Sequence, residues 1–177
     1  HAMAKLRDNK IILFGGMDSL EYARSSSWIF ENNNYGWIEV KTSKTSPVGR
    51  FAHSMEGMGN DQAVMFGGID NDNRILDDTW LCSAREHGIV WTKLISLMSP
   101  RNKFGMAFAS NRLILFGGAV SYKEHYKTTP SIGDDTWTFA TGCSIGEGSS
   151  LIGRAGPACS PCNVGFFKNN TKSRHCD

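Results

Sequence analysis

The chain has 177 residues and a mass of 19.5 kDa, enough for one main domain with a small appendage. Its 19 Lys and Arg residues against 17 Asp and Glu residues give a formal net charge of +2, which makes no electrostatic case for binding nucleic acid or an anionic membrane. The longest apolar runs, such as Ile11 to Phe14, are far shorter than the roughly 20 residues of a membrane-spanning helix, and no secretory signal is visible. The composition predicts a soluble protein.

Three segments with the same pattern recur along the chain, at intervals of 52 and 50 residues measured between Phe14, Phe66 and Phe116. Each is a short apolar run followed by two glycines. The runs are Ile11–Phe14, Ala63–Phe66 and Leu113–Phe116, and the glycines are Gly15, Gly16, Gly67, Gly68, Gly117 and Gly118. Such runs are typical of buried strands, and glycine permits backbone angles that other residues resist, so we expect a turn after each run.

Tryptophans recur in step with these strands. Trp80 and Trp137 each follow Asp-Asp-Thr, and Trp28 stands at the same place in the first copy. A second tryptophan, Trp37 or Trp91, follows about one hairpin later in the first two copies. We expect the first tryptophan of each copy to be buried as part of the structural framework. Each copy then contains four strands in about fifty residues, the count of a β-propeller blade.

The second copy opens with an Arg-x-x-His sequence at Arg50 and His53. Together with the double glycines and the spaced tryptophans, this pattern resembles the kelch repeat over residues 1 to about 141. The resemblance implies an all-β fold of three four-stranded antiparallel blades, forming the C-terminal part of a larger ring, because closed propellers typically take 4 to 8 blades. Three blades alone would leave two apolar faces uncovered, through which the chain could self-associate.

Both ends of this segment carry expectations of their own. His1 stands 13 residues before Phe14, as His53 stands 13 before Phe66, so the chain is expected to begin inside a repeat, although a cloning origin of its first three residues stays open. No second tryptophan follows Trp137, and the chain enters a Gly- and Ser-rich linker, residues 142–156. We therefore expect the third blade to lack its outermost strand.

Four of the five cysteines gather near the C-terminus. They are Cys143, Cys159, Cys162 and Cys176. Residues 157–177 contain Cys-x-x-Cys-x-x-Gly-Phe and resemble the opening of a cysteine-rich module of the ephrin-receptor or tumour-necrosis-factor-receptor type. Disulfides are the preferred chemistry, with three connectivities open, against a zinc site that includes His175 or a redox pair. Asn169 begins a glycosylation sequence, and Cys82, on a predicted strand, is expected to be buried.

Catalytic motifs are not evident in the sequence. It contains no nucleophile elbow, no phosphate-binding loop and no His-Glu-x-x-His helix. The segment Ser121 to Lys127 comes closest to a site, since Glu124, His125 and Tyr126 could bind metal or carry protons, but solvated surface is the preferred interpretation. We expect no enzymatic activity, no cofactor and no metal; a fragment of a kelch-propeller enzyme, oxidase-like or isomerase-like, is the alternative.

The segments between the second and third strands differ most among the copies: Met17 to Ser25, Ile69 to Leu76 and Ala119 to Gly133. Variable loops on a constant scaffold are the default place for binding. The candidate binding residues are Tyr22, Arg24, Asp72, Arg74, Tyr122, His125 and Tyr126. With the cysteine-rich tail, they predict a scaffold that recognises a protein or glycan as part of a secreted, lumenal or membrane-associated glycoprotein. An intracellular kelch adaptor, for ubiquitin ligase or actin, is the alternative.

Overall fold

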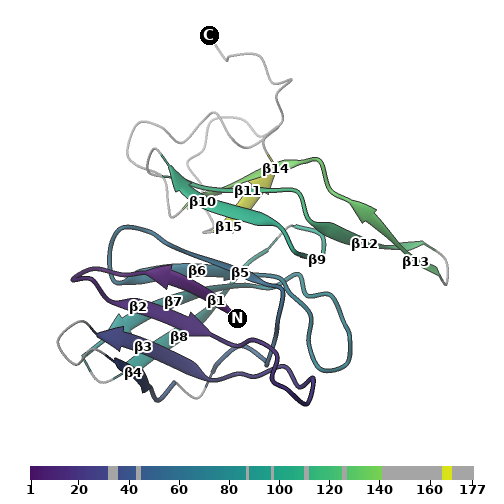
Figure 1. The fold of residues 1–177 in the computed structure, drawn as a ribbon. Coiled ribbons are helices and arrows are strands. Elements are labelled where there is room, and N and C mark those ends of the chain that lie inside the picture. The colour runs from purple at the N-terminus through teal and green to yellow at the C-terminus, as the bar shows by residue number, and fades with distance from the viewer. Residues whose placement is uncertain are drawn as a thin grey trace, which may run out of the picture.

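The computed structural model describes residues 1–31, 36–42, 45–86, 88–96, 98–109, 112–124, 127–140 and 165–168, and the regular elements within them are all β-strands (Figure 1). Most of these strands form three four-stranded antiparallel sheets, which we call the first, second and third blades. The expected all-β architecture of kelch-type blades is thereby confirmed, as an open stack of three and not a closed ring. Among the described elements there is no helix with the length and apolarity needed to cross a membrane.

The strands of each blade follow one another in space as they do in the chain, apart from an insertion in the third. The first blade contains β1 (Ala2–Lys5), β2 (Ile11–Phe14), β3 (Ser27–Glu31) and β4 (Gly36–Glu39). The second contains β5 (Ser54–Gly57), β6 (Gln62–Phe66), β7 (Thr79–Arg85) and β8 (Gly88–Leu94). The third contains β10 (Gly105–Ala109), β11 (Arg112–Phe116), β14 (Thr136–Ala140) and β15 (Gly165–Lys168). The strands that lead into paired glycines, β2, β6 and β11, lie inside their sheets, as predicted.

Strand register repeats from blade to blade. Phe14 pairs with Ala2, Phe66 with Ser54 and Phe116 with Gly105. His1 and His53 therefore hold the same place, one residue before the partner of the phenylalanine. Residues that align between the three copies in sequence therefore occupy equivalent positions in the three blades.

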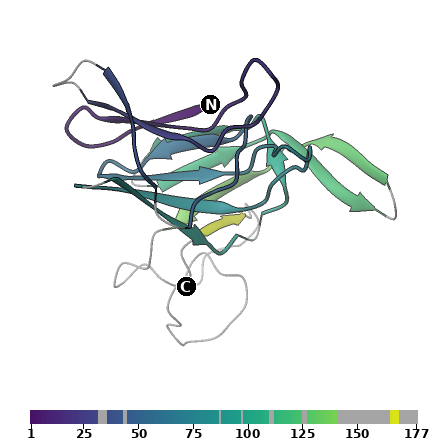
Figure 2. The ribbon, with the colours of Figure 1, turned by 90° about the horizontal axis from the view of Figure 1, so that it is seen from below.

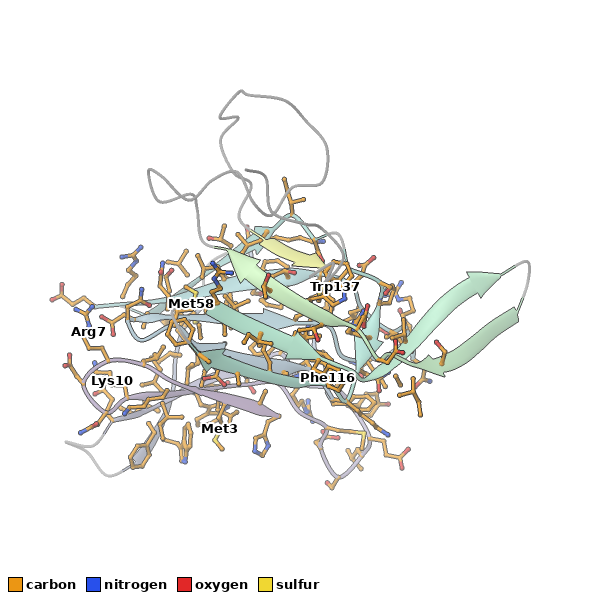
Figure 3. The ribbon with its side chains drawn as sticks, turned by 90° about the horizontal axis from the view of Figure 1, so that it is seen from above. Met3, Arg7, Lys10, Met58, Phe116 and Trp137 are labelled. Carbon is orange, nitrogen blue, oxygen red and sulfur yellow. The ribbon has the colours of Figure 1, made fainter. Side chains whose placement is uncertain are left out.

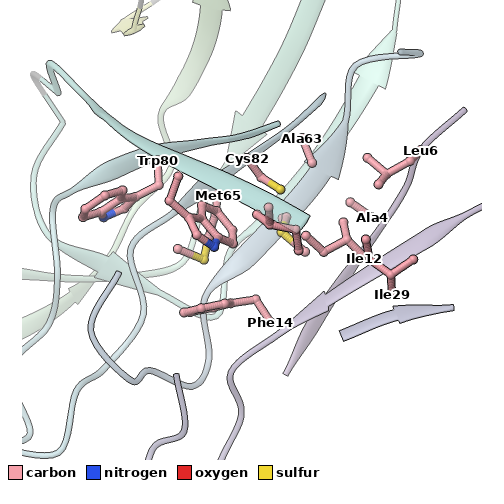
Figure 4. Packing of buried hydrophobic residues seen from close by; sticks show 12 residues of the cluster. Ala4, Leu6, Ile12, Phe14, Ile29, Ala63, Met65, Trp80 and Cys82 are labelled. Atoms are coloured by element: carbon pink, nitrogen blue, oxygen red, sulfur yellow. The ribbon is translucent and has the colours of Figure 1, made fainter. Parts of the chain in front are cut away.

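The blades stack face to face, and the core lies in the two layers between them. Figure 4 shows the layer between the first and second blades, where Ile12 and Phe14 of β2 meet Met65 of β6 and Trp80 and Cys82 of β7. The second layer packs Val64 and Phe66 of β6 against Leu113, Leu115 and Trp137 of the third blade. Because β6 has a blade on each side, four of its five residues are buried, whereas β2 and β11 alternate between more and less buried residues.

The third blade departs from the expectation in two ways. It does not lack its outermost strand, because β15 pairs with β14, placing Lys168 opposite Trp137. The missing second tryptophan had suggested otherwise, but backbone pairing does not require that side chain. The segment expected as a loop after Gly118 contains β12 (Ala119–Glu124) and β13 (Lys127–Ile132), which form a hairpin that projects from the stack (Figure 2). At its base β12 also pairs with β9 (Arg101–Asn102).

The cysteine predictions divide between described and undescribed residues. Cys82 is a free, buried thiol on β7, as expected, and burial raises its pKa to about 12. Cys143, Cys159, Cys162 and Cys176, together with the glycosylation candidate Asn169, lie outside the described residues.

Candidate functional site

The loops that follow the paired glycines lie at one end of the blades. Consecutive strands of an antiparallel sheet run in alternating directions. The loop after the second strand and the linker after the fourth strand therefore lie at the same end of the blade. Three segments meet there: residues 17–25, residues 69–76 and the linker of residues 45–53. We call this the glycine end, and the end formed by the β1–β2 and β5–β6 turns the opposite end. The candidate residues Tyr22, Arg24, Asp72 and Arg74 are all at the glycine end.

Arg50 joins the first blade to the second beneath these loops. Its backbone binds the first blade: the Gly16 amide donates to the Arg50 carbonyl at 2.9 Å, and the Arg50 amide donates to the Arg24 carbonyl at 3.2 Å. Its fully buried side chain binds the second blade, since Nη1 and Nη2 donate to the two carboxylate oxygens of Asp78 at 2.6 and 2.9 Å. Nη1 also donates to the Gly67 carbonyl at 3.0 Å. One residue therefore fixes two blades relative to each other.

Arg101 repeats this arrangement between the second and third blades. The Gly68 amide donates to the Arg101 carbonyl at 3.0 Å, and the Arg101 amide donates to the Leu76 carbonyl at 3.2 Å. Its buried guanidinium donates from Nη1 to Asp135 Oδ1 at 2.9 Å and to the Gly117 carbonyl at 3.2 Å. The Arg-x-x-His pattern marks Arg50 in the sequence, but no local pattern indicates that either arginine joins two blades.

The framework tryptophans complete both clusters. Trp80 Nε1 donates to Asp78 and Trp137 Nε1 donates to Asp135, each at 2.7 Å, and both indoles are buried. Burial alone would raise the pKa of Asp78, but the hydrogen bonds and charge of Arg50 hold the pKa of that carboxyl below its ordinary value. Trp28, at the same place in the first blade, is only half-buried. The expected burial of all three tryptophans holds for two.

In the first two blades, the first glycine of the pair is required by the passing arginine. Gly15 and Gly67 both have φ of 63°, in the left-handed region that favours glycine. A Cβ atom at Gly15 would lie 2.6 Å from the Arg50 carbonyl oxygen, and one at Gly67 would collide with the Arg101 carbonyl oxygen. The structural role predicted for these glycines has a specific cause, the close passage of the next blade's backbone.

The loops of the first two blades are built on the same turn. Asp18 Oδ1 accepts hydrogen bonds from the amides of Leu20 and Tyr22, both at 2.9 Å. Asp70 Oδ1, one repeat later, accepts from the amides of Asp72 and Arg74, also at 2.9 Å. Aspartate commonly orders a turn in this way. Both loop tips therefore have a defined shape.

An arginine binds the turn aspartate in each loop, but from different sequence places. Arg74 lies 2.9 Å from Asp70 through Nε and 2.9 Å from Asp72 through Nη2, whereas Arg24 pairs with Asp18 from two residues further along its loop. Of the candidate binding residues, Arg24, Asp72 and Arg74 are thus exposed members of ion pairs that shape the loops. Their charges remain available to a partner.

Asn71 fastens the two loops to each other. Its Oδ1 accepts from the Ala23 amide at 2.6 Å, and its Nδ2 donates to the Ala23 carbonyl at 3.1 Å. Sequence reasoning missed Asn71, because an asparagine in a loop gives no sign of a partner 48 residues away. The consequence is one continuous surface formed by two loops.

Apolar side chains project from this surface. Met17, Leu20 and Tyr22 have exposed fractions of 52, 71 and 58 %, a high exposure for large apolar groups, and all three lie on the first loop, residues 17–25. Of the remaining candidates, Tyr122 lies on β12, where only its backbone is described, and His125 and Tyr126 lie outside the described residues. Within the described part of the chain, no cluster of three or more His, Cys, Asp or Glu residues could hold a metal ion.

The chain is similar in sequence to known kelch-repeat proteins. The Kelch-repeats domain family described as KLHDC2/KLHL20/DRC7 matches residues 1–160. Kelch domain-containing protein 2 of Bos taurus is 28% identical over 131 residues, covering 68% of this chain and 30% of that protein. Kelch domain-containing protein 1 of Mus musculus is 27% identical over 131 residues, covering 67% and 29%. The tRNA wybutosine-synthesizing protein 4 of Aspergillus fumigatus is 26% identical over 115 residues, covering 64% and 11%. The chain spans less than a third of each relative.

Proposed function

The chain belongs to the KLHDC2/KLHL20/DRC7 kelch-repeat family, and we propose that it is a non-catalytic module that binds a protein partner at its glycine end. The observation that carries the proposal is the joined surface of the first two loops, on which Met17, Leu20 and Tyr22 are exposed above an ordered framework. Methionine, tyrosine and arginine are enriched at protein interfaces. A preformed surface also spares a partner the cost of ordering the loops.

The proposed partner is a protein and not a glycan. The surface presents apolar tips flanked by paired charges, Arg24 with Asp18 and Arg74 with Asp70 and Asp72. Apolar anchors ringed by polar groups are the composition of protein interfaces. The projecting β12–β13 hairpin of the third blade is proposed as a further contact, through Tyr122, His125 and Tyr126.

We place this binding in an intracellular kelch adaptor. The extracellular expectation rested on the cysteine-rich tail, whereas the kelch relatives and the relative named for tRNA wybutosine synthesis favour a protein of the cell interior. In a reducing compartment Cys143, Cys159, Cys162 and Cys176 would remain thiols or bind zinc. Mass spectrometry of the protein from its native compartment, with and without reductant, is expected to show free thiols; a bridge among the four would return the proposal to the cell exterior.

Among the described residues, two sheet faces have no neighbouring blade, and we propose that further blades of the parent protein cover them. In the first blade Met3 is 49 % exposed, and in the third Phe116 is 57 % exposed. Both residues are labelled in Figure 3. The alternative occupant is a second copy of the chain. Sedimentation of the isolated chain and of the full-length parent distinguishes the two. If further blades cover the faces, the parent stays monomeric; if a second copy covers them, the parent is a dimer.

Membership of a larger enzyme is the second candidate function. One relative is named as a wybutosine-synthesizing protein, and the chain covers 11% of it. The kelch segment would then serve as the binding part of that enzyme.

The binding proposal is tested by photo-crosslinking from the glycine end. We would place benzoylphenylalanine at Tyr22 of the parent protein in cells, and at Val90, an exposed position on β8, as the matched control. The expected result is a discrete protein adduct from position 22 and none from position 90. Equal adducts from both positions, or none from position 22, would contradict the proposal.

A further inference from the structure

A hollow lies at the opposite end of the stack, away from the proposed partner surface. It has a volume of about 460 Å³ and receives residues from all three blades: Lys5, Leu6, Arg7, Asp8 and Asn9 of the first, Glu56, Gly57 and Gly59 of the second, and Phe108 of the third. Arg7 and Met58 mark this end in Figure 3. Small-molecule and side-chain sites are typically concave and formed where separate elements meet.

The rim of the hollow is preformed by a tight turn. The Leu6 amide donates to the Lys10 carbonyl at 2.8 Å, and the two residues at the tip, Asp8 and Asn9, have φ of 55° and 57°. Two successive left-handed residues are the mark of a type I′ hairpin turn, which matches the twist of its strands. The wall is closed by Gly57, which lies against the Lys5 carbonyl, where a Cβ atom has no room.

Glu56 supplies a carboxylate inside the hollow. It pairs across the sheet with Val64, whose side chain is buried against the third blade, so Glu56 lies on that same face. It is half-buried, and no side chain of the described residues forms a hydrogen bond or ion pair with it. Burial raises the pKa of the Glu56 carboxyl, although the Gly57 amide acts in the opposite direction. A half-buried carboxylate without a cation is what an incoming cation would stabilise.

Phe108 provides the second contact. It packs at the edge of the core between the second and third blades, and a Cβ atom at Gly59 would lie 3.9 Å from its Cε1. The Phe108 ring therefore borders the same hollow as the carboxylate. A guanidinium or ammonium group is attracted to an aromatic face as well as to a carboxylate. The cations Lys5 and Arg7 are exposed on the rim, where solvent and salt screen them.

We propose that this hollow binds a cationic side chain of a basic peptide, a guanidinium or ammonium group that the Glu56 carboxylate accepts and the Phe108 ring covers. The site is independent of the partner surface at the glycine end, because the two are separated by the length of the strands. The Phe108 ring belongs to the third blade and the turn at the rim belongs to the first, so the site exists only when the three blades are stacked.

The test is a titration of the ¹⁵N-labelled 177-residue chain with N-acetyl-arginine amide, followed by NMR. N-acetyl-citrulline amide, of nearly the same shape but uncharged, is the ligand control. Glu56→Gln removes the charge and keeps the size, and Glu39→Gln, at an exposed position on β4, is the matched protein control. We expect shifts at Gly57, Gly59 and the Asp8–Asn9 turn, with affinity at least about ten-fold lower for citrulline and for Glu56→Gln and unchanged for Glu39→Gln.

Absence of these shifts at millimolar arginine amide would overturn the proposal, and so would equal binding of arginine and citrulline amides by the wild-type chain. The ligand comparison needs no variant, so it decides the question even if Glu56→Gln is destabilised. Phe108→Leu, which keeps an apolar group at the edge of the core, is expected to weaken arginine binding less than Glu56→Gln does. Failure at this site leaves crosslinking from position 22 unaffected.

Discussion

The first and second blades have the same separation between their second and third strands and the same aspartate turn, yet their framework tryptophans differ in burial. Trp80 is 6 % exposed and donates to Asp78, which is held by Arg50, whereas Trp28 is half-buried and Ser26 stands where the aspartate would be. The third blade repeats the second, with Arg101, Asp135 and Trp137. The difference teaches that the tryptophan is fixed by the arginine–aspartate pair that joins two blades, and not by its own repeat alone.

Removing the buried indole should have the largest effect. Trp80→Ala is expected to lower the free energy of unfolding by about 3 to 5 kcal/mol, the range for deleting a large buried aromatic side chain. Trp28→Ala is expected to cost about 1 to 2 kcal/mol, because only part of its surface leaves water. Urea unfolding measures both. Equal losses would show that the two blades do not differ as described.

Breaking the inter-blade pair should cost slightly less. Asp78→Ala leaves the buried guanidinium of Arg50 without its counter-ion and is expected to destabilise the chain by about 3 kcal/mol. Ser26→Ala is the matched control in the first blade and should change stability by less than about 0.5 kcal/mol. A near-neutral Asp78→Ala would remove the arginine–aspartate pair from the account of blade assembly.

Acid should weaken the stack through His53. This side chain is 8 % exposed and meets Phe14 edge-on at 5.9 Å between ring centroids; burial and the charge of Arg50 lower its pKa to about 3. The unfolded chain binds a proton near pH 6.5 and the folded chain does not, so stability is full above that pH and falls as pH decreases toward 3. The expected loss is about 2 kcal/mol between pH 6.5 and pH 5. In His53→Phe the free energy of unfolding should no longer depend on pH in this range. If the dependence persists, a group other than His53 causes it.

The loop tips should matter least to folding. Tyr22 is 58 % exposed, and Arg74 is itself exposed, although it pairs with the buried Asp70 as well as with the exposed Asp72. Tyr22→Ala and Arg74→Ala are each expected to change the free energy of unfolding by less than about 0.5 kcal/mol, as surface changes usually do. Thermal unfolding followed by circular dichroism gives the comparison with Trp80→Ala. Destabilisation of similar size would mean that framework and loop have been confused.

The repeating parts of the fold could be predicted from the sequence because each has a local cause. The runs before Gly15, Gly67 and Gly117 form inner strands, since apolar residues followed by left-handed glycines leave the chain few other choices. The loops of the first two blades were likewise found from their variation between copies.

Contacts between distant residues could not be predicted in this way. Asn71 binds Ala23 across two blades, and Arg50 and Arg101 each act on two blades at once, which no local pattern states. The strand Gly165–Lys168 was missed because the cysteines around it suggested a separate module and no tryptophan marked it. No local pattern brings Glu56 and Phe108 together, because they lie on strands of different blades and border one hollow only in the folded chain.

The central claim is that the glycine-end loops bind a partner while the framework only holds them. The most direct measurement is the affinity of the crosslinked partner for the Tyr22→Ala, Arg74→Ala double variant, with Val90→Ala as the matched control and unfolding free energies taken on the same samples. We predict at least about a ten-fold loss of affinity in the double variant, as expected when interface anchors are truncated, with stability unchanged and the control unaffected. Unchanged affinity in a folded double variant would contradict the account.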